Sequence, residues 1–173
     1  MTCQLFRYSG DVDTLPHQRW LDQDQQDVWR AWLDVSARLP VALHRDLQAN
    51  SDLSLPDFDV LVQLSEHPDG RLRASALAQG LQWERSRLSH HVRRMERRGL
   101  VTREECDDDG RGAWVVVTDT GRRAIEAAAP THVSAVRELV LDALTPAQVR
   151  DLGDILTAIG ARLDSAGDPK DPR

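Results

Sequence analysis

The segment from Trp83 to Gly99, WERSRLSHHVRRMERRG, constrains the fold more than any other part of the chain. At 3.6 residues per turn it divides into two faces, one of which is an apolar stripe of Leu88, Val92 and Met95. The opposite side carries hydroxyl, imidazole and guanidinium groups, at Ser86, Arg87, Ser89, His90, Arg93, Arg94 and Arg97. The pattern predicts a helix that packs through one face and can reach phosphate oxygens and base edges with the other.

A solvated charged face is the simplest explanation of a basic helix, but the distribution of charge favours a binding surface. Residues 85–103 contain seven arginines and one glutamate, a net charge of +6. Because the whole chain carries −6, the remaining residues carry −12. A compact cationic segment on an acidic body is typical of proteins that bind polyanions.

Length and composition exclude several classes of protein. A chain of 173 residues with 40% hydrophobic content can bury one core and keep an association surface. No apolar run approaches the roughly 20 residues of a membrane span, and no signal peptide opens the chain, so we expect a soluble, cytoplasmic protein. No P-loop, nucleophile elbow or H-E-x-x-H motif occurs, so no enzyme is indicated. Cys3 and Cys106 are predicted to be free thiols; a redox switch there is the alternative.

Two helices and a strand are predicted before the basic segment. Residues 24–50 have helical periodicity, and Pro40 should kink or break that helix near Ser36. Ser54 and Asp57 form a capping box for a second helix that stops at the His67-Pro68 pair, and the stretch Arg71-Leu72-Arg73 follows as one short strand.

A helix-turn-helix and a hairpin are predicted next. Residues 74–79 form a short helix ended by Gly80, and the basic helix, 84–98, follows at once, as in a helix-turn-helix. Two β-prone runs then flank an Asp/Gly-rich loop, which predicts a hairpin of the kind called a wing. Its tip presents Arg111, which suits a narrow minor groove, and Asp109 either braces that arginine or caps the turn.

The C-terminal part is predicted to form two helices. Thr118 caps the first, which runs to about Asp142 with a kink at Pro130, and Thr145-Pro146-Ala147-Gln148 is a complete start for the second. The second helix carries an apolar seam of Leu152, Ile155, Leu156, Ile159 and Leu163. The predicted regions are an irregular arm (1–23), a dimerisation region (24–50 plus 121–164), a winged helix-turn-helix domain (54–120) and a disordered tail (165–173).

Residues 25–163 resemble the MarR family of bacterial transcription regulators, with an actinobacterial type of C-terminal segment. The most specific matches are the Glu96-Arg97-Arg98-Gly99-Leu100-Val101 exit, the Asp109-Gly110-Arg111 tip and the Thr118-Asp119-Thr120-Gly121 start. The resemblance implies a mainly α fold with a small β-sheet, in the order helix, helix, strand, helix, helix, strand, strand, helix, helix.

The resemblance also implies function. It suggests a homodimer, joined by the terminal helices, that binds pseudo-palindromic double-stranded DNA and usually represses. By position, Ser86, Arg87, Ser89, His90 and Arg93 should face the major groove and Arg111 the minor groove. Trp83 stands where a small capping residue is commoner, so packing or a phosphate contact should hold the start of this helix. His90 stands where a base-reading residue is common, so base preference does not carry over.

Three questions stay open at the level of sequence. A small aromatic or anionic effector is expected for such a regulator, and Trp29, Trp32, His44 and Phe58 are the residues predicted to line its pocket. Alternatives are a DNA binder without an effector and a winged-helix module whose basic face binds an acidic protein. No cofactor or metal is expected, although His44 and His132 could meet near a dimer seam.

Overall fold

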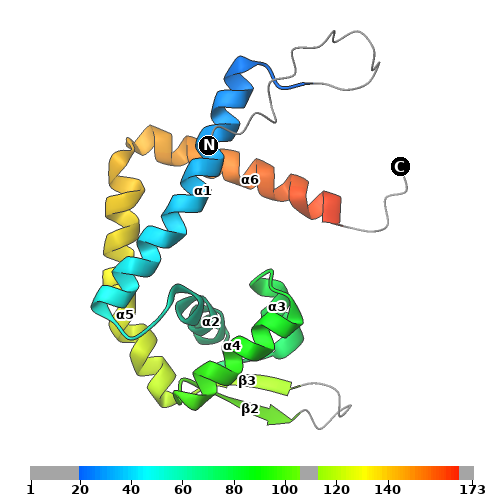
Figure 1. Ribbon diagram of the computed structural model, residues 1–173, viewed down its shortest axis with the longest axis vertical. Helices are drawn as coiled ribbons and strands as arrows, with labels where there is room; N and C mark the ends of the chain where they lie inside the picture. The colour runs from blue at the N-terminus through cyan, green and yellow to red at the C-terminus, as the bar shows by residue number, and fades with distance from the viewer. Residues whose placement is uncertain (1–19, 106–112, 168–173) are drawn as a thin grey trace, which may run out of the picture. The chain divides into compact units, whose positions relative to one another are not determined.

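The computed structural model describes residues 20–105 and 113–167 of the protein, and their elements follow the predicted order. They are α1 (Gln23–Asn50), α2 (Leu55–Glu66), β1 (Arg71–Arg73), α3 (Ala74–Gly80), α4 (Arg85–Arg97), β2 (Val101–Glu105), β3 (Ala113–Val117), α5 (Asp119–Leu139), a 3-10 helix (Leu141–Ala143) and α6 (Pro146–Gly167) (Figure 1). This is the predicted fold class, mainly α with a small sheet. None of the helices in these ranges has the length and apolar character that a membrane crossing requires.

The chain divides after Ala42 into two compact units. The described part of the first unit is largely the N-terminal portion of α1, which runs through Pro40 without interruption. The predicted break near Ser36 is therefore wrong. Proline removes one hydrogen bond from the helix, but Ser36 is exposed, so the carbonyl that loses its partner stays open to water.

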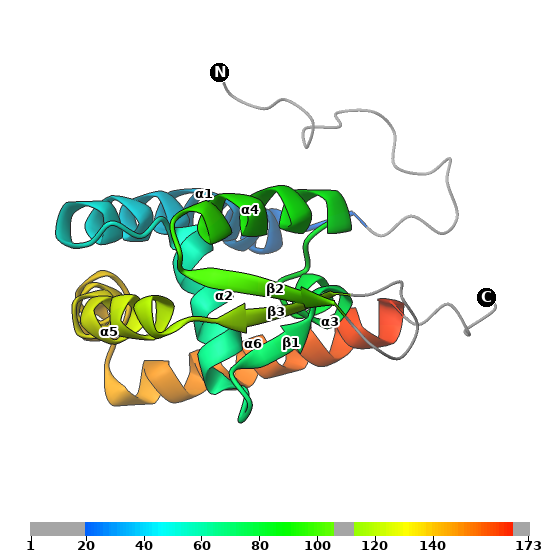
Figure 2. The ribbon, with the colours of Figure 1, turned by 90° about the horizontal axis from the view of Figure 1, so that it is seen from below.

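In the second unit, three antiparallel strands form one sheet in the order β1–β3–β2 (Figure 2). Leu72 pairs with Val115 across the β1–β3 ladder, and Val101 pairs with Val117 across the β2–β3 ladder. The predicted strand and hairpin are thus confirmed. Because alternate residues of a strand point to opposite faces, Val115 and Val117 point into the core and Trp114 lies on the other face.

Side-chain caps start the helices at the predicted positions. The Asp57 backbone N–H donates to Ser54 Oγ at 3.2 Å, and the Ser54 N–H donates to Asp57 Oδ2 at 2.9 Å, which completes the capping box. Thr118 Oγ1 accepts the N–H of Gly121 at 3.0 Å at the start of α5. These caps satisfy backbone donors that have no partner inside the helix.

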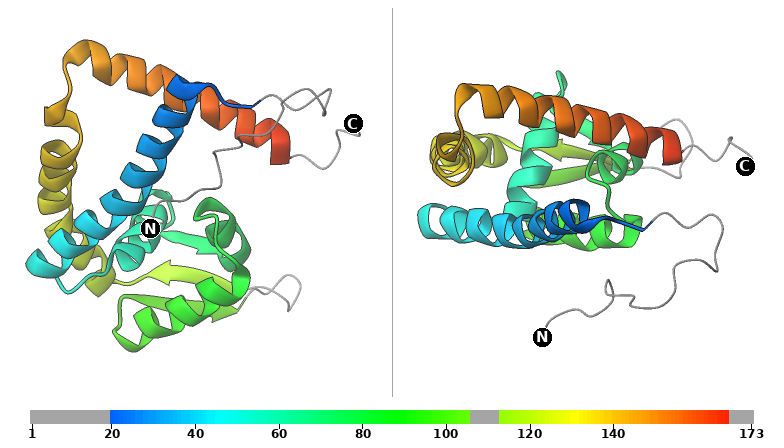
Figure 3. Two further views of the ribbon diagram at one scale, coloured as in Figure 1. Left: turned by 45° about the horizontal axis from the view of Figure 1, so that its top comes forward. Right: turned by 90° about the horizontal axis from the view of Figure 1, so that it is seen from above.

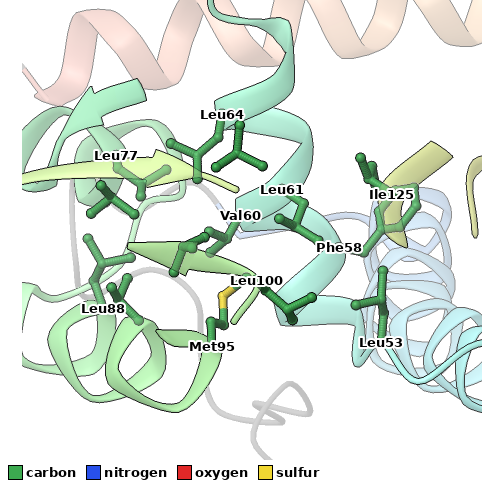
Figure 4. Close-up of a cluster of buried hydrophobic side chains, with 14 of the residues drawn as sticks. Leu53, Phe58, Val60, Leu61, Leu64, Leu77, Leu88, Met95, Leu100 and Ile125 are labelled. Carbon is green, nitrogen blue, oxygen red and sulfur yellow. The ribbon is translucent and has the colours of Figure 1, made fainter. Parts of the chain in front are cut away.

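The core of the second unit lies where α2, α3, α4, the sheet and the start of α5 meet (Figure 4). Leu61, Leu64, Leu77 and Met95 are at most 1% exposed and come from α2, α3 and α4. Burial of each such side chain stabilises the fold by about 1.5–3 kcal/mol, so this cluster holds α4 firmly against the rest of the winged domain.

The last two helices leave the winged domain in succession. Figure 3 follows the chain from α5 through the 3-10 helix into α6. The helix α6 continues to Gly167, past Ser165, where the sequence predicted the start of the tail. The Ser165 hydroxyl donates to the Ala161 carbonyl at 2.9 Å, so this residue joins the helical hydrogen bonding instead of ending it.

Candidate nucleic-acid interface

The helix α4 is oriented by its apolar stripe. Leu88, Val92 and Met95 are each at most 2% exposed and belong to the core cluster. The stripe buries one side of the helix and leaves the opposite side at the surface. The orientation on which any role in DNA recognition depends is therefore set by hydrophobic packing.

The turn between α3 and α4 is closed by backbone hydrogen bonds. The N–H of Trp83 donates to the carbonyl of Ala78 at 2.8 Å, and the N–H of Gln82 donates to Gln79 at 3.0 Å. Gln82 adopts a positive φ of 53°, a conformation that L-residues seldom take, so the turn is tightly determined by its surroundings. Short helix, tight turn and second helix make up the predicted helix-turn-helix.

The start of α4 is held by packing. Glu84 occupies the N-cap position without a side-chain cap hydrogen bond. Trp83, immediately before it, is half-buried, and its ring meets the ring of His91 edge-on at 5.3 Å between centroids. The capping position is thus Glu84 and not Trp83, and the predicted packing contact is made by the tryptophan just before the cap.

The predicted DNA-facing residues within the described ranges share one exposed surface. We call it the outer face of α4; it comprises Ser86, Arg87, Ser89, His90, Arg93, Arg94 and Arg97, all of them exposed. His90, Arg93, Arg94 and Arg97 border a shallow hollow in this surface. Among the described residues, neither Arg93 nor Arg97 forms an ion pair, so both guanidiniums are available to an anion. The two wing residues Arg111 and Asp109 lie outside the described residues.

A second cationic hollow lies between α4 and the strands. It is lined by Arg73, Arg85 and Arg103, together with Ser75 and Ser89 and apolar side chains of α4 and β3. Arg103 also pairs with Glu96 at 2.8 Å. Arg85 and Arg103 belong to the cationic segment 85–103, but none of the three arginines was among the predicted DNA contacts, because they come from three different elements. The guanidinium and hydroxyl groups suit a phosphate oxygen.

A buried polar cluster joins α4 to α2. Asp57, 3% exposed, places Oδ1 at 3.0 Å from His91 Nε2 and Oδ2 at 2.7 Å from a guanidinium nitrogen of Arg98. Burial alone would raise the pKa of Asp57, but hydrogen bonds from His91, Ser54 and Arg98 outweigh it and hold this pKa well below its usual value of 3.8. The carboxylate is therefore ionised, and it joins α2 to His91, in the middle of α4, and to Arg98, at the C-terminal end of α4.

The four residues predicted to line an effector pocket are divided between the two units. In the first unit, Trp29 and Trp32 are 42% and 43% exposed. In the second unit, His44 Nδ1 accepts the N–H of Leu55 at 3.2 Å. Phe58 is buried, with its ring 4.2 Å from that of His132. The pocket stays a prediction.

Within residues 20–105 and 113–167, no three His, Cys, Asp or Glu side chains gather as a metal site would require. Cys3 and Cys106 lie outside these ranges, so the thiol alternative is not addressed by the structure.

Comparison with known proteins gives concordant matches. Residues 51–112 match the family model described as MarR family. The fold is similar to that of AbsC, a MarR family transcriptional regulator from Streptomyces coelicolor, at 38% identity and a TM-score of 0.79, over 86% of this chain and 99% of that one. It is also similar to Sco3205, a MarR family regulator from the same organism in complex with DNA, at 39% identity and a TM-score of 0.82, over 89% and 97% of the two chains. The uncharacterized HTH-type transcriptional regulator YfiV of Bacillus subtilis (strain 168) is 22% identical over 160 residues, which are 92% of this chain and 97% of that protein.

Proposed function

Because the chain belongs to the MarR family of transcription regulators, we propose that it acts as a homodimer on a pseudo-palindromic double-stranded operator, as a repressor. Each protomer inserts the outer face of α4 into the major groove and Arg111 of the wing into the adjacent minor groove. The dimer reads about one helical turn per half-site, with half-site centres roughly 34–36 Å apart. Binding to the chromosome places its site of action in the cytoplasm.

One observation carries this proposal: the outer face of α4 is exposed and cationic while its opposite stripe is fully buried. The DNA complex of Sco3205, 39% identical to this chain, adds support at the level of the family. Arginine–phosphate contacts supply most of the affinity in our proposal, and Ser89 and His90 contribute to base preference.

The apolar side chains left exposed on α1 and α6 support dimerisation. In the first unit, Val28, Leu33 and Val35 are 46–71% exposed. In the second unit, Ile155, Leu156, Ile159 and Leu163 form the exposed seam of α6. Clusters of large apolar side chains in contact with water are typical of association surfaces, and the two-fold symmetry of a homodimer matches a palindromic operator.

The salt dependence of DNA binding tests the proposal. If the dimer neutralises about six to ten phosphates, its affinity for duplex DNA should fall by about 10³–10⁵ between 50 and 200 mM salt. Fluorescence anisotropy at several salt concentrations measures this slope. A flat salt response would contradict the proposal, and tight binding to an acidic protein without duplex binding would support the protein-association alternative.

Substitutions separate the proposed contacts. Arg93→Ala should weaken binding to every duplex, whereas Ser89→Ala and His90→Ala should change sequence preference. Arg111→Ala should weaken binding strongly and leave the dimer intact in size-exclusion chromatography. An unchanged preference in both the Ser89 and His90 variants would remove them from base reading, and loss of the dimer in the Arg111 variant would mean that the wing is misassigned.

Relief by a small aromatic or anionic effector is the final part of the proposal. Trp29 and Trp32 offer half-exposed indole rings for such a ligand. A ligand at 100 times its dissociation constant should stabilise the protein by about 2.7 kcal/mol, which a thermal-shift screen detects. Binding that leaves DNA affinity unchanged would favour regulation without this effector.

A further inference from the structure

A histidine stands on the buried side of α4, between a carboxylate and a DNA-facing arginine. His91 is 5% exposed; its Nε2 lies 3.0 Å from Asp57 Oδ1, and its Nδ1 lies 2.8 Å from a guanidinium nitrogen of Arg94. Because guanidinium groups only donate hydrogen bonds, Nδ1 must be the acceptor in the contact with Arg94. The proton of the neutral ring is therefore on Nε2, which lies 3.0 Å from Asp57 Oδ1, and the negative charge of that carboxylate favours the tautomer that leaves the Nδ1 lone pair to Arg94.

Asp57 can orient the imidazole because it is itself fixed. Its Oδ2 accepts the Ser54 backbone N–H at 2.9 Å and a guanidinium N–H of Arg98 at 2.7 Å. The carboxylate therefore belongs to the capping box of α2 and cannot turn away from His91 without breaking both contacts. The orientation of the ring is tied to a helix that lies in the core.

His91 is also linked to Arg87, indirectly through the ring of Trp83. The ring of Trp83 stands edge-on to the His91 ring, at 85° between planes. The guanidinium carbon of Arg87 lies 4.3 Å from the centroid of the Trp83 ring, within the range of a cation–π contact. His91 thus supports the indole on which Arg87 stacks.

We propose that Asp57 and His91 position two arginines of the outer face of α4, Arg94 directly and Arg87 through Trp83, for contact with the DNA backbone; this inference rests on the proposed function. An arginine already held in one rotamer loses less conformational freedom when it binds a phosphate. Arg94 commits one of its five N–H donors to His91, and the others remain free. His91 is a positioning residue, because it is 5% exposed and lies on the side of α4 opposite the outer face.

The positioning role of His91 is tested with the His91→Phe variant, which keeps an aromatic ring in contact with Trp83 but removes both ring nitrogens. Binding to a mixed-sequence duplex about three helical turns long is measured for the wild-type dimer, His91→Phe, Arg94→Ala and the double variant. Phosphate contacts do not depend on sequence, so no operator is needed. We expect His91→Phe and Arg94→Ala each to lower affinity at least about tenfold and to reduce the salt slope by about 1 per protomer. The double variant should bind no more weakly than Arg94→Ala.

A control separates positioning from stability. Val60→Ala, in the same α2 and fully buried, removes two methyl groups and no polar group, so it should lower the melting temperature without changing the affinity of the folded dimer or its salt slope. If His91→Phe behaves like Val60→Ala, or if its effect adds fully to that of Arg94→Ala, the positioning role is wrong. If the wild-type dimer binds no duplex, the proposed function itself fails.

A measurement on the wild type covers the case in which His91→Phe does not fold. Imidazole ¹⁵N chemical shifts should show a protonated Nε2 and a hydrogen-bonded, unprotonated Nδ1, both in the free dimer and with the same duplex bound. A free Nδ1 in the complex would show that Arg94 leaves His91 in order to bind DNA, and would overturn the proposal. Trp83→Leu tests the indirect link to Arg87. Its effect on DNA affinity should disappear in a protein that already carries Arg87→Ala.

Discussion

Gly121, at the start of α5, packs directly against the carbonyl oxygen of Leu100, at the exit from α4. A methyl group at position 121 would overlap that oxygen and press on the Val117 side chain. Thr118 closes the same junction, since its hydroxyl lies 2.6 Å from the Gly99 carbonyl and caps α5. The exit from α4, the strand β3 and the start of α5 therefore meet without room for an added methyl group.

The Gly121→Ala variant should be destabilised, because backbone atoms cannot yield as a flexible side chain can. We expect a loss of about 1–3 kcal/mol, and each kcal/mol lowers the melting temperature by about 2–4 °C in a chain of this size. Thr120→Ala, the exposed neighbouring substitution, should stay within about 0.5 kcal/mol in the same thermal melts. Equal melting temperatures for the two variants would mean that the junction is loosely packed.

Gly99 has a different constraint, namely its backbone conformation. Its φ is 69°, and nothing lies within 4 Å of the position that a Cβ would take. The N–H of Leu100 donates to Met95 at 3.0 Å and that of Gly99 to Glu96 at 2.9 Å, the pair of bonds that ends a helix in a Schellman motif. Gly99→Ala should cost about 1–2 kcal/mol in urea unfolding, and Gly99→Asn should cost less, since asparagine tolerates this conformation better. An alanine variant as stable as the wild type would contradict this account of the helix end.

The acid sensitivity of the fold should depend on Asp57. The pKa of Asp57 is lowered in the folded state, so the unfolded chain binds the proton more readily. The stabilisation of the fold by the ionised carboxylate is therefore complete above the ordinary pKa of 3.8 and is lost as the pH falls toward the folded-state pKa. Asp57→Asn should therefore be less stable than the wild type at pH 7, and the difference between their free energies of unfolding should become smaller below about pH 4. Urea unfolding at a series of pH values measures this difference in free energy. A difference that does not change with pH would contradict an ionised Asp57 in the folded protein.

Asp59 provides a control of opposite sign on the same helix. Burial raises the pKa of Asp59, although His132, His91 and Arg87 partly offset it. A raised pKa means that the folded state holds its proton longer, so this group destabilises the fold as the pH rises through its titration. Asp59→Asn should remove this destabilisation and so raise the free energy of unfolding at neutral pH. If Asp59→Asn instead loses stability with the same pH profile as Asp57→Asn, the environments of the two carboxyl groups are misassigned.

The seam of α6 should hold the dimer together. Ile159 is 43% exposed in a single chain, and a carboxylate placed there would have to be buried on association. Ile159→Asp should therefore shift the protein toward monomers in sedimentation at micromolar concentration and weaken DNA binding. Ala161→Asp places the same charge on the opposite side of α6 and should leave the dimer unchanged. A dimeric Ile159→Asp protein would exclude this seam as the interface.

Local signals in the sequence predicted most of the winged domain. The Ser54 capping box, the alternation around Val115 and the apolar stripe of α4 each depend on residues a few positions apart, and each is present in the structure. Pro40 misled the prediction because a proline signals a helix break by itself, whereas the residues on both sides here keep the helix continuous.

The parts of the interface that the sequence did not reveal come from tertiary contacts. Asp57 could be recognised only as a cap and His91 only as a buried residue, since nothing in a helical repeat joins residues 34 positions apart. In the same way, Arg73 and Arg103 meet Arg85 only after the sheet has formed. Packing decides which of the many arginines converge, and packing is not periodic in the sequence.

Selection of bound duplexes from a random pool tests the central claim most directly. A dimer that presents two copies of the outer face of α4 should enrich an inverted repeat with half-site centres about 10–10.5 base pairs apart. Substitution of Ser89 or His90 should change the same position in both halves of that repeat. Recovery of no preferred sequence, or of a single asymmetric half-site, would contradict the account of a paired reading surface.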